Sequence, residues 1–224
     1  MRISTTILES FRLYLRPEET WPTEETLLAT IRREFQPTRQ MVIGQAFGRI
    51  LERPSAYRID GGYCVQSQEF GDIILGDDVI GPALELIQPT TVFEPKGVKE
   101  YAGHEVVARA DQLHGADLIE TKTTFAGYNI ERYLESAQWR YLADIFAVPR
   151  VTYQVYVLDE HSNGVIALKS LEIVPVYAYP TLHRACEALV EQFVAYIDLK
   201  DRSGLGLRAM LHARQRTCGR DVLC

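Results

Sequence analysis

The residues best suited to chemistry lie in one stretch near the middle of the chain. Asp111 ends a strand-like segment, VVARAD, and a second strand-like segment, DLIETKTT, carries Glu120 and Lys122. Side chains alternate between the two faces of a strand, so Glu120 and Lys122 share one face while Thr121 takes the other. If the two segments pair as a hairpin, two carboxylates and one ammonium group meet at one end of a sheet.

This set of side chains suits a divalent cation and phosphate chemistry. Two adjacent carboxylates repel each other, and Mg²⁺ or Mn²⁺ relieves the repulsion because it takes oxygen ligands and keeps water in its shell. Such a cation lowers the pKa of a bound water and neutralises charge on a phosphate. We therefore predict Asp111 and Glu120 as metal ligands, with the Thr121 carbonyl as a further candidate. Lys122 is placed to orient the attacking water or to stabilise transition-state charge.

A helix is expected directly after these strands, from about Ile130 to Phe146, and it carries Gln138 and Tyr141 three residues apart on one face. A glutamine among apolar neighbours must find hydrogen-bond partners. Gln138 therefore either faces a pocket or bonds a strand carbonyl. Tyr141 either supports the same site or is a core tyrosine with a solvated hydroxyl.

The ordered set resembles the PD-(D/E)XK nuclease superfamily, most closely its RecB-type exonuclease branch. That branch has an Asp closing one strand, an (Asp/Glu)-x-Lys motif in the next, and a helix with a Gln and a Tyr. Here Asp111, Glu120-Thr121-Lys122, Gln138 and Tyr141 match this order. The resemblance implies a Mg²⁺- or Mn²⁺-dependent nuclease, and it favours supporting roles for Gln138 and Tyr141 at the site.

A weaker resemblance extends upstream, where MVIGQAFGRILE is similar to the branch's Gly-x-x-x-His helix that ends in Leu-Glu. Glu52 matches the last position, and we predict that it supports the site, with an exposed helix-end glutamate as the alternative. Gly48 stands where the family has its histidine. Because that histidine helps to hold a metal in relatives, its replacement bears on a second metal site or on full activity.

The bulk composition suits one globular domain. The chain has 224 residues, of which 46% are hydrophobic and 24% charged. We expect a single α/β domain, 1–224, with a helical lead-in (1–54), an α/β core (55–200) and a basic C-terminal tail (201–224). The core is expected to be a central mixed sheet of about four or five strands flanked by helices, the restriction-endonuclease-like arrangement that the resemblance implies.

The expected elements follow from hydrophobic periodicity and turn residues. The helices are Ile3–Leu15, Thr23–Phe35, Met41–Arg53, Val79–Ile87, Ile130–Phe146 and Thr181–Leu199, and Thr5 or Thr6 caps the first. The strands are Thr90–Glu94, Val106–Asp111, the DLIETKTT segment, Val151–Leu158 and Val165–Val174, with short strand-like pieces around Tyr63–Val65 and Ile73–Leu75. We expect a polar loop at Pro95–Gly103 and a short break at Gln112–Ala116.

The net charge of −6 argues mildly against a nucleic-acid binder, but phosphate contacts need only a local basic strip. The candidate strips are Arg32-Arg33 with Arg39, Lys96 with Lys99, and a tail with Arg202, Arg208, Arg214, Arg216 and Arg220. No apolar run is long enough to span a bilayer and no signal peptide is recognised, so we expect a cytoplasmic protein. The four scattered cysteines do not read as a disulfide framework.

The sequence thus predicts a metal-dependent deoxyribonuclease, most naturally an exonuclease in recombination, repair or phage DNA processing. DNA is the expected partner, and the tail is a candidate docking segment for a recombinase or another protein. One alternative is an inactive nuclease-fold subunit that binds DNA or acts as a scaffold, which Gly48 favours. Another is an unrelated small-molecule-binding α/β protein, which predicts no metal binding at Asp111.

Overall fold

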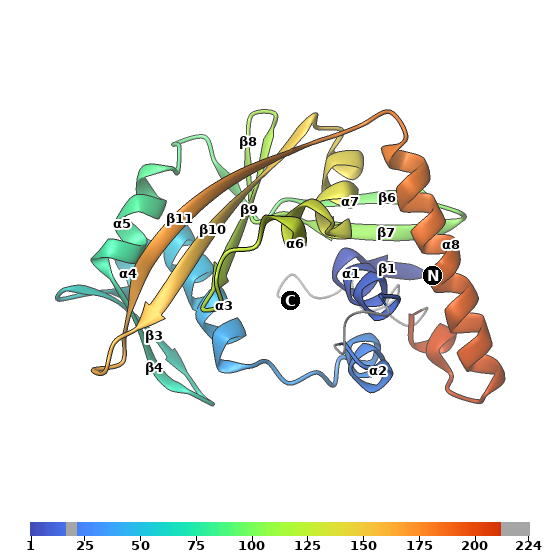
Figure 1. The fold of residues 1–224 in the computed structure, drawn as a ribbon, viewed down its shortest axis with the longest axis horizontal. Coiled ribbons are helices and arrows are strands. Elements are labelled where there is room, and N and C mark those ends of the chain that lie inside the picture. The colour runs from blue at the N-terminus through green and yellow to red at the C-terminus, as the bar shows by residue number, and fades with distance from the viewer. Residues whose placement is uncertain (17–21, 212–224) are drawn as a thin grey trace.

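A computed structural model describes residues 1–16 and 22–211 as two sheets with helices packed around them (Figure 1). The larger sheet runs, in spatial order, β2 (Arg58–Ile59), β3 (Gly62–Ser67), β4 (Gly71–Gly76), β11 (Val165–Tyr177), β10 (Arg150–Glu160), β9 (Asp117–Thr124), β8 (Gln112–His114) and β5 (Val92–Phe93). The smaller sheet runs β1 (Arg2–Ser4), β7 (His104–Arg109) and β6 (Lys96–Tyr101).

The helices lie singly or in groups between runs of these strands. They are α1 (Thr5–Tyr14), α2 (Glu24–Arg32), α3 (Arg39–Glu52), α4 (Pro54–Tyr57), α5 (Asp77–Glu85), α6 (Ile130–Leu134), α7 (Ala137–Phe146) and α8 (Leu182–Arg202). The larger sheet is mixed, since β10 is parallel to β9 and antiparallel to β11. The predicted α/β class is confirmed. The predicted strand count was too low, because the described part of the larger sheet has eight strands, several of them short.

Two hydrophobic cores lie on either side of the site described below. One packs α1, α7, α8 and the smaller sheet together, with Phe11 against Phe193 at its centre. The other packs α3 and α5 on the far end of the larger sheet, with Phe47 against Tyr156. Strand β10 belongs to both, because Tyr153 lies in the first core and Tyr156 in the second. The two cores therefore hold α3 and α7 in fixed positions relative to the middle of β9.

The first predicted helix began too early. Residues Arg2–Ser4 form β1, which pairs in parallel with β7, and Ile3 is fully buried there. The helix starts at Thr5, and the Ser4 hydroxyl, not that of Thr5 or Thr6, accepts the capping hydrogen bond from the Ile7 N–H. A buried strand residue before the cap is favoured because its apolar side chain completes the core under the helix.

The predicted hairpin partner of DLIETKTT was wrong. Strand β7 pairs with β6, and β6 occupies most of the segment expected to be the loop Pro95–Gly103, turning at Ala102 and Gly103, both with positive φ. The expected break at Gln112–Ala116 contains β8, which is the actual antiparallel partner of β9. Exposed residues alternate with less exposed ones along β6, and half of its residues are charged, so this one-sided strand resembled a polar loop.

Other predicted elements are confirmed with shifted ends. The predicted helix Ile130–Phe146 is two helices. The first, α6, ends at Leu134, and Ser136 then begins the second, α7, because its hydroxyl accepts a capping hydrogen bond from the Gln138 N–H.

Within the described residues, no helix has both the length and the apolar character needed to cross a membrane. Cys64 and Cys186 are free thiols, and Cys218 and Cys224 lie outside the described residues, as does most of the predicted tail.

Candidate active site

The site is built on the free edge of β9. Strand β8 pairs with β9 only as far as Gln112, which lies opposite Ile119. Beyond Ile119, β9 pairs with β10 along one edge, and no described strand pairs with its other edge. Asp111 immediately precedes β8, and its carboxylate oxygen Oδ2 accepts a hydrogen bond of 2.7 Å from the Thr121 N–H. A strand residue directs its N–H and C=O to the same side, so the Thr121 carbonyl shares the edge with Asp111.

Glu120 is held by a closed set of hydrogen bonds. Its Oε1 accepts from the Asp111 N–H at 3.2 Å, and its Oε2 accepts from the Lys122 Nζ at 3.0 Å and from the Gln138 Nε2 at 2.8 Å. The Gln138 Oε1 in turn accepts from the Lys122 Nζ at 3.1 Å. The predicted meeting of Asp111, Glu120 and Lys122 therefore occurs, although through β8 and not through a β7–β9 hairpin.

The electrostatics of Glu120 indicate a site that lacks positive charge. The side chain is fully buried, and its burial, followed by repulsion from Asp111, raises its pKa to about 7 despite the nearby Lys122 ammonium. One lysine thus does not offset the burial of Glu120 together with its repulsion from Asp111. A further cation beside Glu120 would favour its ionised form.

The surroundings of Lys122 favour its charged ammonium form, which donates hydrogen bonds. Burial alone lowers the pKa of its amine, but the Glu120 and Asp111 carboxylates outweigh that effect and raise the pKa above its usual range. The side chain keeps 32% of its surface exposed. An ammonium has three N–H donors, and two of them are used by Glu120 and Gln138. The third is available to a ligand in the pocket, and the raised pKa favours the charged form that donates it.

The oxygen atoms present fit a magnesium- or manganese-type ion. A carboxylate offers about four lone-pair sites, and the hydrogen bonds to Glu120 occupy three of them. Asp111 accepts through Oδ2, and its Oδ1 has no hydrogen-bond partner in the described part of the chain. The Thr121 Oγ1 is likewise buried with no partner among those residues. No cluster of three or more His, Cys, Asp or Glu side chains forms among them, so water would complete the shell, as Mg²⁺ prefers.

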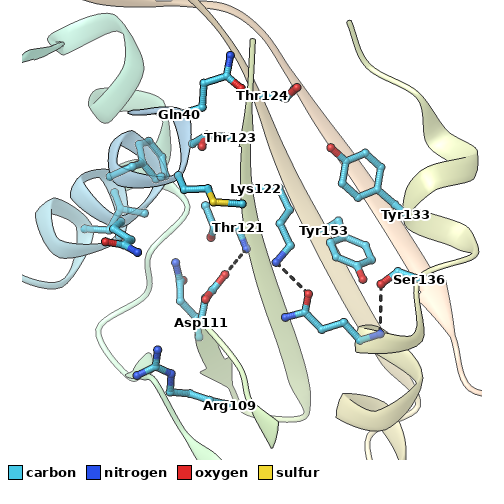
Figure 2. A pocket seen from close by; sticks show the side chains of 18 of the residues that line it. Gln40, Arg109, Asp111, Thr121, Lys122, Thr123, Thr124, Tyr133, Ser136 and Tyr153 are labelled. Carbon is cyan, nitrogen blue, oxygen red and sulfur yellow. Dashed lines mark hydrogen bonds between the residues drawn. The ribbon is translucent and has the colours of Figure 1, made fainter. Parts of the chain in front are cut away.

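A cavity of about 910 Å³ opens over this edge. Figure 2 shows Asp111 and Lys122 on opposite sides of β9, with Tyr133, Tyr153 and Ser136 on the Lys122 side. Helix α3 forms the other wall. Of the residues that line the cavity, the sequence interpretation missed Arg49, Phe93, Arg109, Arg132, Tyr133, Ser136 and Tyr153. The only signal for Arg49 was its place next to Gly48, which stands at the family's histidine position.

Helix α3 presents one stripe to the cavity, formed by Met41, Gly44, Gln45, Gly48 and Glu52. Glu52 thus reaches the cavity lining, where it lies exposed and 3.8 Å from the Arg53 guanidinium. The two glycines have different surroundings. A Cβ on Gly44 would lie 3.0 Å from the Thr123 Oγ1, whereas a Cβ on Gly48 would meet nothing within 4 Å. Gly44 therefore allows α3 to approach β9, and Gly48 leaves open space.

Replacing Gly48 by histidine is expected to lower the Mn²⁺ concentration needed for half-maximal cleavage and to tighten Mn²⁺ binding measured by calorimetry. The reason is that an imidazole on this stripe adds a nitrogen ligand where the space is open. Helix propensity also favours most residues over glycine, which is about 0.5–1 kcal/mol less favourable than alanine in a helix interior.

Gly81→His is the matched control for this test, since Gly81 also lies within a helix with nothing within 4 Å of its Cβ but does not line the cavity. Both variants should melt at higher temperature, and only Gly48→His should change the metal titration. An unchanged titration would show that position 48 does not reach the metal.

Gln138 and Tyr141 do not share the site. Gln138 lies in the first turn of α7 and reaches Lys122 and Glu120, so its partners are side chains and not a strand carbonyl. Tyr141 is fully buried one turn later, where its hydroxyl donates to the Cys186 carbonyl at 2.7 Å. Tyr141 does not line the cavity, because α8 covers that part of α7, and its surroundings are those of the core tyrosine that the sequence left open as the alternative.

The basic strips proposed from the sequence lie elsewhere. Arg39 forms an ion pair with Glu160, and Lys99 forms one with Asp144. In the tail, Arg208 pairs with Asp198, and Arg214, Arg216 and Arg220 are outside the described residues. None of the described strip residues lines the cavity, whose cationic side chains are Arg49, Arg109, Lys122 and Arg132.

No protein-family model and no curated protein matches this chain. Among solved structures, it is similar to a putative exonuclease from Eubacterium rectale, at 10% identity over 91% of this chain and 82% of the other, with a TM-score of 0.49. It is also similar to the alkaline exonuclease LHK-Exo from Laribacter hongkongensis, at 13% identity over 98% and 94% of the chains and a TM-score of 0.42. A phage-related exonuclease from Haemophilus somnus shares 9% identity over 88% and 96%, with a TM-score of 0.43. The three structures named here are described as exonucleases, the first of them as a putative one.

Proposed function

We propose that this protein is a Mg²⁺- or Mn²⁺-dependent deoxyribonuclease of the PD-(D/E)XK type. The observation that carries the proposal is the Glu120 carboxylate, which is buried and accepts hydrogen bonds from the Asp111 N–H and the Lys122 ammonium, while Asp111 and Lys122 line an open cavity. Two neighbouring carboxylates with a single lysine to offset their charge favour a bound cation, and the donor on Lys122 suits a phosphate or its attacking water.

The residues have separate roles in this proposal. Asp111, Glu120 and the Thr121 carbonyl would hold the cation, which when bound supplies an acidified water and neutralises phosphate charge. Lys122 donates its third N–H to the attacking water or to a phosphate oxygen, and its raised pKa keeps it protonated while it does so. Gln138 bonds Lys122 and Glu120 together, so it fixes the direction of the free N–H.

The biological setting proposed is DNA recombination, repair or phage DNA processing, with exonuclease action. An inactive DNA-binding or scaffold subunit is the second candidate, and the observation that favours it is Gly48 on the cavity wall in place of a metal-binding side chain. The two candidates differ in one respect that is simple to measure, since only the first turns over DNA when metal is added.

The test is cleavage of end-labelled linear DNA and of closed circular DNA of the same sequence, with Mg²⁺, with Mn²⁺ and with a chelator. We expect the linear DNA to be degraded with either metal, the closed circle to persist, and both to persist with the chelator. An identically purified Asp111→Asn protein controls for contaminating nucleases. Cleavage that survives chelation contradicts the proposed chemistry, and intact DNA in every tube favours the scaffold.

A further inference from the structure

Glu9 of α1 lines the cavity although its charge has the same sign as that of a phosphate. The neighbouring Arg12 balances this charge, because its guanidinium donates to both carboxylate oxygens, from Nη2 to Oε1 at 2.7 Å and from Nε to Oε2 at 3.2 Å. Two parallel hydrogen bonds between planar groups set the direction of the carboxylate as well as its charge balance. Glu9 is therefore held in one orientation on the cavity wall.

The second partner of Glu9 is the first residue of α7. The Glu9 Oε2 accepts a hydrogen bond of 2.6 Å from the Ala137 N–H, which lies 128 positions later in the chain. The first four N–H groups of a helix have no acceptor within the helix, and the positive end of the helix dipole attracts a carboxylate there. The Ser136 hydroxyl satisfies the next of these groups by accepting from the Gln138 N–H at 3.1 Å. The start of α7 is thus held by its own cap and by a side chain from α1.

Gln138, the second residue of α7, connects this helix start to the site. Its side-chain amide bonds Glu120 through Nε2 at 2.8 Å and Lys122 through Oε1 at 3.1 Å. Hydrogen bonds between N–H and oxygen weaken beyond about 3.2 Å, so a shift of about 1 Å in the first turn of α7 would break both of them. Glu9 has no hydrogen bond with Glu120 or Lys122 in the described part of the chain. The path from Glu9 to the site therefore runs through the backbone of Ala137 and the side chain of Gln138.

We propose that Glu9 is a positioning residue of the active site. It fixes the first turn of α7, and Gln138 in that turn then sets the positions of the Glu120 carboxylate and of the free N–H of Lys122. The effect of Glu9 on cleavage rests on the proposed nuclease function, whereas its effect on Gln138 does not. In this role Glu9 acts on the backbone of α7 and not on the substrate.

The kinetic test is a double-mutant cycle between Glu9 and Gln138. Glu9→Ala is expected to slow single-turnover cleavage by about ten- to hundredfold, since a misplacement of about 1 Å at a site costs up to about that much. In a protein that already carries Gln138→Ala, Glu9→Ala should slow cleavage no further, because two residues that act along one path are not additive. Glu9→Gln should lose less than Glu9→Ala, since its amide oxygen can still accept the Ala137 N–H. Equal slowing by Glu9→Ala in both backgrounds overturns the inference.

The position of the Gln138 side chain is measured separately, by the ¹H–¹⁵N resonances of its NH₂ group, which are identified by their loss in Gln138→Ala. Glu9→Ala should shift these resonances towards the values of a solvated glutamine, because the bond to Glu120 is weakened. Unchanged resonances overturn the inference whether or not the protein cuts DNA. A wild type that cuts no DNA contradicts the nuclease function alone, and the resonances then still decide the role of Glu9.

Glu187→Ala is the matched control, because Glu187 also accepts a hydrogen bond from a distant backbone N–H, that of Ala102 at 3.3 Å, and does not line the cavity. It should leave both the Gln138 resonances and the cleavage rate unchanged. Melting curves establish that each variant is folded at the temperature of the measurements. A shift of the resonances by Glu187→Ala equal to that by Glu9→Ala would mean a general loosening of the fold and would also overturn the inference.

Discussion

Asp111→Asn is expected to abolish detectable cleavage and to weaken Mn²⁺ binding while the fold survives. The asparagine side-chain oxygen can still accept the Thr121 N–H, so the local hydrogen bond at the edge of β9 is kept. The substitution removes one of the two negative charges that would hold the cation. It also places the NH₂ group of an amide, which cannot ligate a cation, where a carboxylate oxygen stood. Glu120→Gln should have the same effect on metal binding, because Glu120 supplies the other charge.

The measurement is Mn²⁺ titration calorimetry on each variant, with melting curves to confirm folding. Asp72→Asn is the matched control, because Asp72 lies exposed on β4 and does not line the cavity. It should retain both cleavage and Mn²⁺ affinity. Undiminished Mn²⁺ affinity in Asp111→Asn and Glu120→Gln alike would remove the metal site from the proposal and leave the small-molecule-binding alternative open.

Lys122→Ala is expected to slow single-turnover cleavage by about 10²–10³, the usual loss when one preorganised stabilising group is removed. DNA binding should persist, and Mn²⁺ binding should be retained or tightened, because a positive charge 3.0 Å from Glu120 is deleted. The fold should lose some stability, since Glu120 remains buried without its ion-pair partner. Melting curves therefore accompany the kinetics, so that the rate is compared at temperatures where both proteins are folded.

Two further variants separate chemistry from charge and from general surface effects. Lys122→Arg should not restore the full rate. A planar guanidinium is larger than an ammonium, so it cannot bond both Glu120 and Gln138 and still present a third N–H in the same direction. Lys169→Ala, on the exposed face of β11, should behave like the wild type. Rates for Lys122→Ala within a factor of about three of the wild type, a difference well under 1 kcal/mol in barrier height, would remove the lysine from the mechanism.

The local part of the site follows from the sequence alone. Glu120 and Lys122 are two residues apart on a strand, and the period of an extended chain places them on one face whatever surrounds them. The segment between Asp111 and Glu120 is just long enough to form the short antiparallel pair of β8 and β9. The closeness of Asp111 to Glu120 therefore also depends on few residues of the chain. These distances are fixed by backbone geometry over a few residues, which explains why the sequence interpretation placed these three together correctly.

Strand pairing was decided by the tertiary structure. The segment VVARAD could have paired with DLIETKTT, but it is covered on both sides in the smaller sheet, by β1 on one edge and β6 on the other. Ala108 and Val106 are fully buried there, in the core that also holds residues of α1 and α8. The choice between two partners depends on how much apolar surface each arrangement buries across the whole molecule, and no local pattern carries that information.

The walls of the cavity are the least local feature. Gln138 and Tyr141 share a helix, yet only Gln138 reaches Glu120, because α8 and the smaller sheet cover the next turn of α7. Arg49 and Arg132 come from helices in separate halves of the chain and face one cavity only because two hydrophobic cores fix α3 and α6 around β9. The sequence thus determined the chemical groups and their spacing along one strand. The packing of distant segments determined which other groups meet them, because contacts between such segments are set by burial and not by chain spacing.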